Sequence, residues 1–182
     1  GRCRRCKAEI SVQYPIIEGL NGFLWVFVFL VNGMNVMSVV YCLMTSALLV
    51  LSVIDWRTFE IPFGINVFLG ILGIVAVVLD KGEWLNHVIG AVCVSGFLLL
   101  LYLLSKGRAI GGGDIKLMAA CGLLLGWQKS ILAFLLGCIV GSVIHLFRMK
   151  ISKEGHVLAM GPYLAAGIFL AALFGGQWIH WY

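Results

Sequence analysis

Long apolar stretches separated by short polar segments dominate this chain of 182 residues. A helix needs about 20 apolar residues to cross the roughly 30 Å hydrocarbon core of a bilayer, and several of these stretches reach that length. Hydrophobic residues make up 62% of the sequence and charged residues only 12%, whereas a soluble domain has about 25% charged residues. The sequence therefore predicts an all-α fold, a polytopic transmembrane helical bundle, with no separate soluble core.

Seven segments have the composition of membrane helices. Pro62 and Pro162 fall where two of them begin, a position that tolerates proline because the first turn needs no backbone N–H donor. One segment has only about a dozen residues, too few for a full crossing, so it must tilt or be shielded by its neighbours. The predicted segments are 14–31, 35–54, 62–79, 87–104, 114–125, 129–147 and 161–176.

The distribution of Lys and Arg predicts the orientation in the membrane. If the helices alternate in direction, all of the 13 Lys and Arg residues except Lys81 and Lys129 fall on one side. Cytoplasmic loops carry such an excess, so this side, which also holds Asp55 and Asp114, is predicted to face the cytoplasm. The basic loops explain the net charge of +5 without nucleic acid, because no aromatic-interleaved basic surface is present. The expected surroundings are lipid.

Asp55 and Asp114 stand apart from the other acidic residues. Asp55 ends one apolar segment, and Asp114 opens another directly after three glycines, 111–113. Ionisable residues at membrane depth are costly and mark functional sites. Two carboxyls about 3 Å apart share one proton, which leaves one to activate water and the other to act as an acid. The pair predicts an aspartyl peptidase, although each residue alone could be structural, Asp114 as a helix N-cap.

The glycine run before Asp114 has two interpretations. Glycine permits a positive φ and a close approach of backbone, so an open strip could pair with an extended peptide. A flexible turn is the simpler alternative. A phosphate-binding loop is disfavoured, because the Gly-Lys-Ser/Thr sequence of such loops does not follow.

Four stretches together resemble the bacterial type IV prepilin peptidases, the GxGD class of intramembrane aspartyl proteases. They are Asp55 with Ile61-Pro62, the run Gly-Gly-Gly-Asp-Ile-Lys-Leu at 111–117, the segment from Cys-Arg-Arg-Cys at 3–6 to Tyr-Pro-Ile-Ile-Glu at 14–18, and Met-Gly-Pro-Tyr-Leu-Ala at 160–165. They follow one another in the family's order over nearly the whole chain.

The resemblance implies an aspartic endopeptidase of the bacterial inner membrane. It would remove the basic leader from type IV prepilins and type II secretion pseudopilins at the cytoplasmic face. Asp55 and Asp114 would be catalytic, and Gly111, Gly113 and Lys116 would bind the substrate. No cofactor is expected for this peptidase activity.

Cys3 and Cys6 form a Cys-x2-Cys pair, for which metal binding is the usual role in a reducing compartment. A structural zinc site needs four ligands, so this pair is half of one. Members of the family have two such pairs in a cytoplasmic loop linked to methylation of the new N-terminus by S-adenosylmethionine. We therefore expect an N-terminally truncated chain in which 1–13 is a remnant of that loop and 14–182 is the peptidase domain. Zinc and methylation would belong to the full-length protein.

Two alternatives remain open. One is an archaeal preflagellin peptidase, against which the Cys-x2-Cys pair and the Tyr-Pro-Ile-Ile-Glu stretch argue. The other is a small proton- or cation-coupled transporter that uses the two aspartates as a relay. Transporters often show inverted repeats and binding near the midplane, whereas no repeat is evident here and both acids fall at one face.

Overall fold

The computed structural model describes residues 11–107, 110–151 and 159–180. Within these ranges the chain forms seven helices and no strand, which confirms the all-α prediction. The predicted segments agree with the observed helices to about one turn at either end. The helices are α1 (Gln13–Asn32), α2 (Val36–Thr58), α3 (Phe63–Leu79), α4 (Trp84–Leu104), α5 (Gly112–Leu125), α6 (Trp127–Ile151) and α7 (Gly161–His180).

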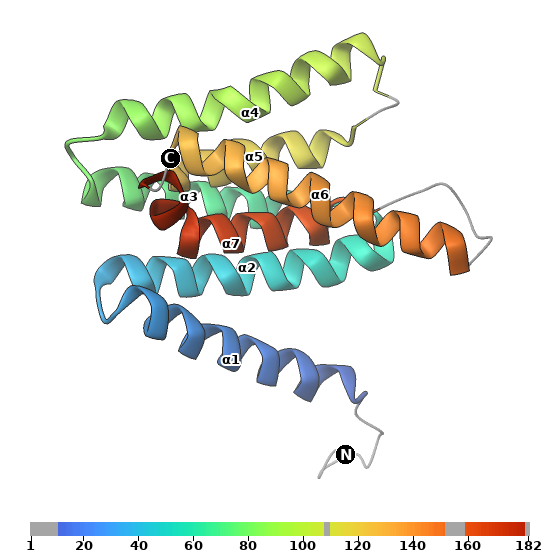
Figure 1. Cartoon of the computed structure of the whole chain (residues 1–182), viewed down its shortest axis with the longest axis horizontal. Helices are drawn as coiled ribbons and strands as arrows, with labels where there is room; N and C mark the ends of the chain where they lie inside the picture. The colour runs from blue at the N-terminus through green and yellow to red at the C-terminus, as the bar shows by residue number, and fades with distance from the viewer. Residues whose placement is uncertain (1–10, 108–109, 152–158, 181–182) are drawn as a thin grey trace.

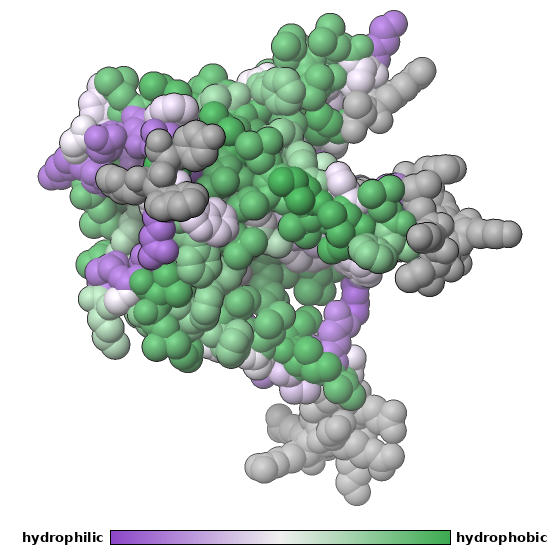
Figure 2. All heavy atoms as spheres, viewed as in Figure 1, coloured by the Kyte–Doolittle hydropathy of each residue, from purple (hydrophilic) through white to green (hydrophobic). Residues whose placement is uncertain are grey.

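Five of these helices, α1, α2, α4, α6 and α7, are long and apolar enough to cross a membrane. The surface agrees, because hydrophobic residues cover the length of the bundle and hydrophilic residues gather toward its two ends (Figure 2). Large apolar side chains such as Leu30, Ile74 and Leu104 are more than half exposed, which suits contact with lipid rather than water. The chain is a multi-pass membrane protein.

Successive helices run in opposite directions, as the alternating pattern of charged loops requires (Figure 1). The end of α2 and the starts of α5 and α7 therefore lie at the same end of the bundle, on the right of Figure 1. Arg57, Lys106 and Lys116 belong to this end, whereas Lys81 and Lys129 belong to the other. This arrangement brings Asp55, in the last turn of α2, toward Asp114, in the first turn of α5.

Glycines let the helices pack closely. A Cβ on Gly122 of α5 would lie 2.2 Å from the carbonyl oxygen of Gly90 in α4, and a Cβ on Gly167 of α7 would lie 2.2 Å from the carbonyl oxygen of Ala133 in α6. Helix association in lipid depends on such small residues, because packing and hydrogen bonds must replace the hydrophobic effect. The short α5 is shielded by this packing, and its inward residues Leu117 and Met118 are fully buried.

The first helix is the most loosely held. Val28 is the one buried residue of α1, and α1 lies at the edge of the bundle (Figure 1). Polar side chains tie it to α2: the indole N–H of Trp25 donates to the Ser46 hydroxyl at 2.9 Å, and that hydroxyl donates to Asn21 at 2.9 Å.

Candidate active site

Asp55 lies one turn before the end of α2, where its side chain is only 5% exposed. The helix ends at Phe59, whose left-handed φ of 54° stops it and whose N–H bonds the Asp55 carbonyl at 2.9 Å. The Asp55 carboxylate accepts a hydrogen bond of 2.9 Å from the backbone N–H of Gly161, the first residue of α7. A helix N-terminus favours an anion, so the start of α7 both positions this carboxylate and stabilises its charged form.

Gly161 is required at this contact. A Cβ at this position would lie 2.6 Å from Oδ2 of Asp55 and 2.9 Å from its Cγ. The sequence placed Gly161 in a stretch resembling the prepilin peptidases, but nothing in the pattern indicated that it contacts Asp55, which lies 106 residues earlier.

Asp114 lies in the first turn of α5 and is half-buried. The N-cap of α5 is Gly111, not Asp114, so the alternative that Asp114 is the N-cap is wrong. Its carboxylate instead interacts with the backbone N–H of Gly111, as the acidic residue of a capping box does three positions into a helix. Oδ2 of Asp114 therefore lies back over the start of α5, close to Gly111.

The three glycines before Asp114 have different surroundings. A Cβ on Gly113 would lie 2.9 Å from Cβ of Ile61, and a Cβ on Gly111 would lie 3.2 Å from Oδ2 of Asp114, whereas a Cβ on Gly112 would meet nothing within 4 Å. None of the three has a positive φ. Gly112 and Gly113 are already helical, so the expectation of an open strip for edge pairing is wrong. Close packing against Ile61 and Asp114 is what glycine provides here.

Asp55 and Asp114 line one cavity of about 330 Å³, and their carboxyls interact electrostatically. The cavity lies between the end of α2, the start of α3 and the start of α5. Its lining residues are Asp55, Phe59, Glu60, Ile61, Phe63, Asn66, Gly111, Gly112, Gly113, Asp114 and Lys116.

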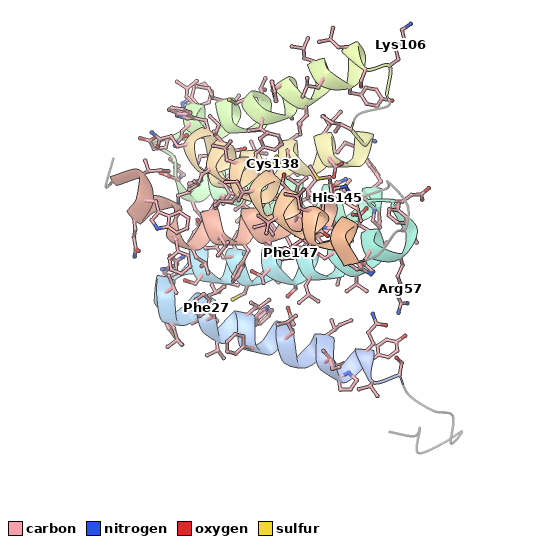
Figure 3. All side chains as sticks on the ribbon, turned by 45° about the vertical axis from the view of Figure 1, so that its right-hand side comes forward. Phe27, Arg57, Lys106, Cys138, His145 and Phe147 are labelled. Carbon is pink, nitrogen blue, oxygen red and sulfur yellow. The ribbon has the colours of Figure 1, made fainter. Side chains whose placement is uncertain are left out.

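The cavity brings together five residues predicted from the sequence: Asp55, Asp114, Gly111, Gly113 and Lys116. The ammonium of Lys116 lies 5.5 Å from the centre of the Phe63 ring, a cation–π contact that keeps this charge beside the cavity. Arg57 and Lys106 point outward from the same end of the bundle (Figure 3). This end of the apolar bundle therefore carries the two aspartates together with basic side chains around them.

The predicted metal ligands Cys3 and Cys6 lie outside the described residues. In the part of the chain that the structure describes, no group of three or more His, Cys, Asp and Glu side chains could hold a metal ion. The sequence did not identify Glu60 and Asn66 as site residues, although both line the cavity. The one signal in the sequence was that each lies within about one helical turn of the Ile61-Pro62 motif.

A larger apolar groove of about 500 Å³ runs between α1, α2 and α7. Neither Asp55 nor Asp114 lines it. The chemistry therefore belongs to the smaller cavity.

Comparison with known proteins decides the family. The model of the type IV leader peptidase family matches residues 42–146, a range that includes both Asp55 and Asp114. The chain belongs to the type IV leader peptidase family. The model of the bacterial peptidase A24 N-terminal domain also matches, at residues 1–32, which agrees with the bacterial rather than the archaeal alternative.

Relatives of this family member bear the name prepilin leader peptidase/N-methyltransferase. The protein from Aeromonas salmonicida (strain A449) is 34% identical over 191 residues, covering 100% of this chain and 65% of the relative. The protein from Pseudomonas putida is 35% identical over 191 residues, covering 97% and 64% respectively. The chain thus spans about 65% of the length of such relatives. No solved structure matches it. The transporter alternative finds no support in these matches.

Proposed function

We propose that this chain is a membrane-embedded aspartic endopeptidase that hydrolyses the leader peptide of type IV prepilins and type II secretion pseudopilins. One observation carries the proposal. Asp55 and Asp114 are far apart in the sequence, yet they line one cavity at one end of the bundle. Paired carboxyls in a partly desolvated site are the machinery of aspartic proteases, and the relatives' names specify a prepilin leader as the peptide cleaved.

Hydrolysis by this pair needs one ionised and one protonated carboxyl. The ionised group takes a proton from water, and the water oxygen attacks the carbonyl carbon of the scissile peptide bond. The protonated group donates its proton to the carbonyl oxygen. When the intermediate collapses, the C–N bond breaks, the departing nitrogen takes up the proton that came from water, and a hydroxyl of the intermediate returns a proton to the carboxyl that acted as the acid. The Gly161 N–H stabilises negative charge on Asp55 whenever that carboxyl is ionised.

The end of the bundle that carries the two acids faces the cytoplasm of the bacterial inner membrane in this proposal. The positive-inside bias supports it, because Arg57, Lys106 and Lys116 lie at that end. A prepilin whose hydrophobic helix sits in the bilayer presents its leader at this interface. The cavity between α2, α3 and α5 is therefore at the depth where the scissile bond would arrive.

The division of the chain follows the same proposal. In this proposal residues 14–182 form the peptidase domain, and residues 1–13 belong to a loop linked to methylation. The word N-methyltransferase in the relatives' names supports S-adenosylmethionine as a cosubstrate of the full-length protein. Cys3 and Cys6 would then supply two of the four ligands that a structural zinc site needs.

Cleavage of a purified prepilin by the chain in liposomes tests the proposal. Asp55→Asn and Asp114→Asn should each lower the cleavage rate at least about 10³-fold. Asp80→Asn is the matched control, because Asp80 lies at the opposite end, with a carboxylate oxygen 3.7 Å from Nε2 of His87. Substantial cleavage by either active-site variant, or ion flux by a wild-type protein that cleaves nothing, would overturn the proposal.

A further inference from the structure

The apolar groove of about 500 Å³ lies between helices that diverge toward the end of the bundle with the two aspartates. α1 and α2 lie close together at the left of Figure 1 and separate toward the right. Where they are close, the Trp25 indole donates a hydrogen bond to the short side chain of Ser46. Where they are apart, the guanidinium of Arg57 donates to Oε1 of Gln13, so two long side chains span the gap.

The groove adjoins the proposed catalytic pair. Trp56 lines the groove and directly follows Asp55, and Pro162 lines it and directly follows Gly161, whose N–H bonds the Asp55 carboxylate at 2.9 Å. Successive residues of a helix are about 100° apart, so the face of α2 with Ser52 and Trp56 lies about a quarter turn from Asp55. The groove and the cavity of the two acids therefore lie on neighbouring faces of the same end of α2.

The length of the groove suits a segment of helix. Its α2 wall runs from Trp56 back to Thr45, about 16 Å at 1.5 Å per residue. This is about half of the roughly 30 Å hydrocarbon core of a bilayer. The volume has room for the three to four apolar side chains that two turns of an amphipathic helix present on one face, by the usual spacing of about 3.6 residues per turn.

Small side chains form much of the groove wall. They are Thr45 and Ser52 of α2 and Ala165 and Ala166 of α7. Each hydroxyl already donates to the carbonyl oxygen four residues earlier in its own helix, at 2.7 Å, so this part of the wall needs no polar partner from outside. Small residues let a second backbone come close, which is how helices associate in lipid.

We propose that this groove binds the apolar helix of the peptide substrate, the segment that follows the scissile bond. This inference rests on the proposed peptidase function and adds a second binding surface to it. A lipid tail could fill the same volume, but it has no need of a wall of small residues or of a position beside Asp55. A substrate helix needs both, because its first residues must reach the two acids while the rest stays in the bilayer.

Photocrosslinking in liposomes tests which molecule occupies the groove. A benzophenone-bearing phenylalanine analogue replaces Ala166, a half-buried groove residue, in the Asp114→Asn chain so that prepilin stays uncleaved. Irradiation should join this position to the apolar helix of prepilin. Ser95 of α4 is the control position, because it is also half-buried in a long apolar helix but does not line the groove. It should give no prepilin adduct.

Kinetics of the otherwise wild-type chain give a second readout. Ala166→Phe narrows the groove and should raise KM for prepilin about tenfold or more, while kcat stays within about twofold, as expected when only binding of the substrate is lost. Ser95→Phe should leave both within about twofold. If Ala166→Phe does not fold, Leu20→Trp narrows the groove from the α1 side, where Leu20 is 48% exposed, and should raise KM in the same way.

Adducts with lipid alone at saturating prepilin, or with a second copy of the chain alone, would overturn the inference. So would prepilin adducts of equal yield from positions 166 and 95, or an unchanged KM in folded variants of the groove. These results would leave the peptidase proposal in place, provided that the wild-type chain cleaves and Asp55→Asn does not. Absence of cleavage by the wild-type chain would instead refute the proposed function.

Discussion

Replacing Gly161 with alanine tests how tightly the start of α7 determines the position of the Asp55 carboxylate. The added methyl carbon would lie 2.6 Å from Oδ2, 2.9 Å from Cγ and 3.1 Å from Cβ of Asp55. Favourable contacts between carbon atoms lie at about 3.5–4.0 Å. The carboxylate must therefore retreat by roughly 0.5–1 Å, and its hydrogen bond from the Gly161 N–H, now 2.9 Å long, must lengthen or break.

A displacement of about 1 Å in a catalytic group lowers a rate by about 10²-fold, which corresponds to about 2.7 kcal/mol of activation free energy. We expect a loss of that size in leader cleavage by Gly161→Ala. Overpacking of a well-packed contact costs about 1–3 kcal/mol, so the free energy of unfolding should fall by a similar amount. The two effects are separable, because the rate is measured on folded protein.

The assay is single-turnover cleavage of purified prepilin in liposomes, with thermal unfolding followed in parallel. Gly176→Ala is the control, because it lies in the same helix and a Cβ there would meet no heavy atom within 4 Å. It should cleave at the wild-type rate. If Gly161→Ala also cleaved within about threefold of wild type, the contact with α7 would not determine where the Asp55 carboxylate lies.

Three further predictions concern packing. Gly113→Ala puts a methyl carbon 2.9 Å from an isoleucine Cβ beside the cavity, so steady-state kinetics should show at least about a tenfold loss of cleavage rate. Gly112→Ala is the control, because its methyl carbon meets open space, and its cleavage rate should fall far less. Gly122→Ala puts a methyl carbon 2.2 Å from the Gly90 carbonyl oxygen and should lower the melting temperature, at a cost of about 1–3 kcal/mol; an unchanged melting temperature would contradict the α4–α5 contact. Ser46→Ala removes the hydroxyl that bonds α1, so limited proteolysis should cut α1 faster while cleavage of prepilin stays unchanged, with a stability loss of about 0.6–1.7 kcal/mol.

The helices were predictable because each depends mainly on its own residues. A continuous apolar run must satisfy its backbone groups internally in lipid, and a helix does so at any point of the chain. All seven predicted segments correspond to observed helices. The ends differ by about one turn, because caps depend on local contacts: α2 continues past Asp55 to Thr58, and α5 begins two residues before Asp114.

The two aspartates were also visible in the sequence, since a charge in an apolar setting is costly enough to need a reason. Their spacing along the chain says nothing about the cavity that they share. Glu60 and Asn66 looked like ordinary loop and helix residues. Only the packing of α3 against α5, with Ile61 on Gly113, brings them beside the carboxyls.

The sequence by itself determined the all-α membrane architecture, the family and the two acids, because hydropathy, charge and motif order are properties of a linear chain. The tertiary structure alone decided that the Gly161 N–H holds Asp55 across 106 residues and that Glu60 and Asn66 lie beside the cavity of the two acids. The physical reason is that hydrogen-bond partners and close contacts depend on which helices pack together. That packing depends on small residues such as Gly122 and Gly167, whose effect appears only when two backbones meet.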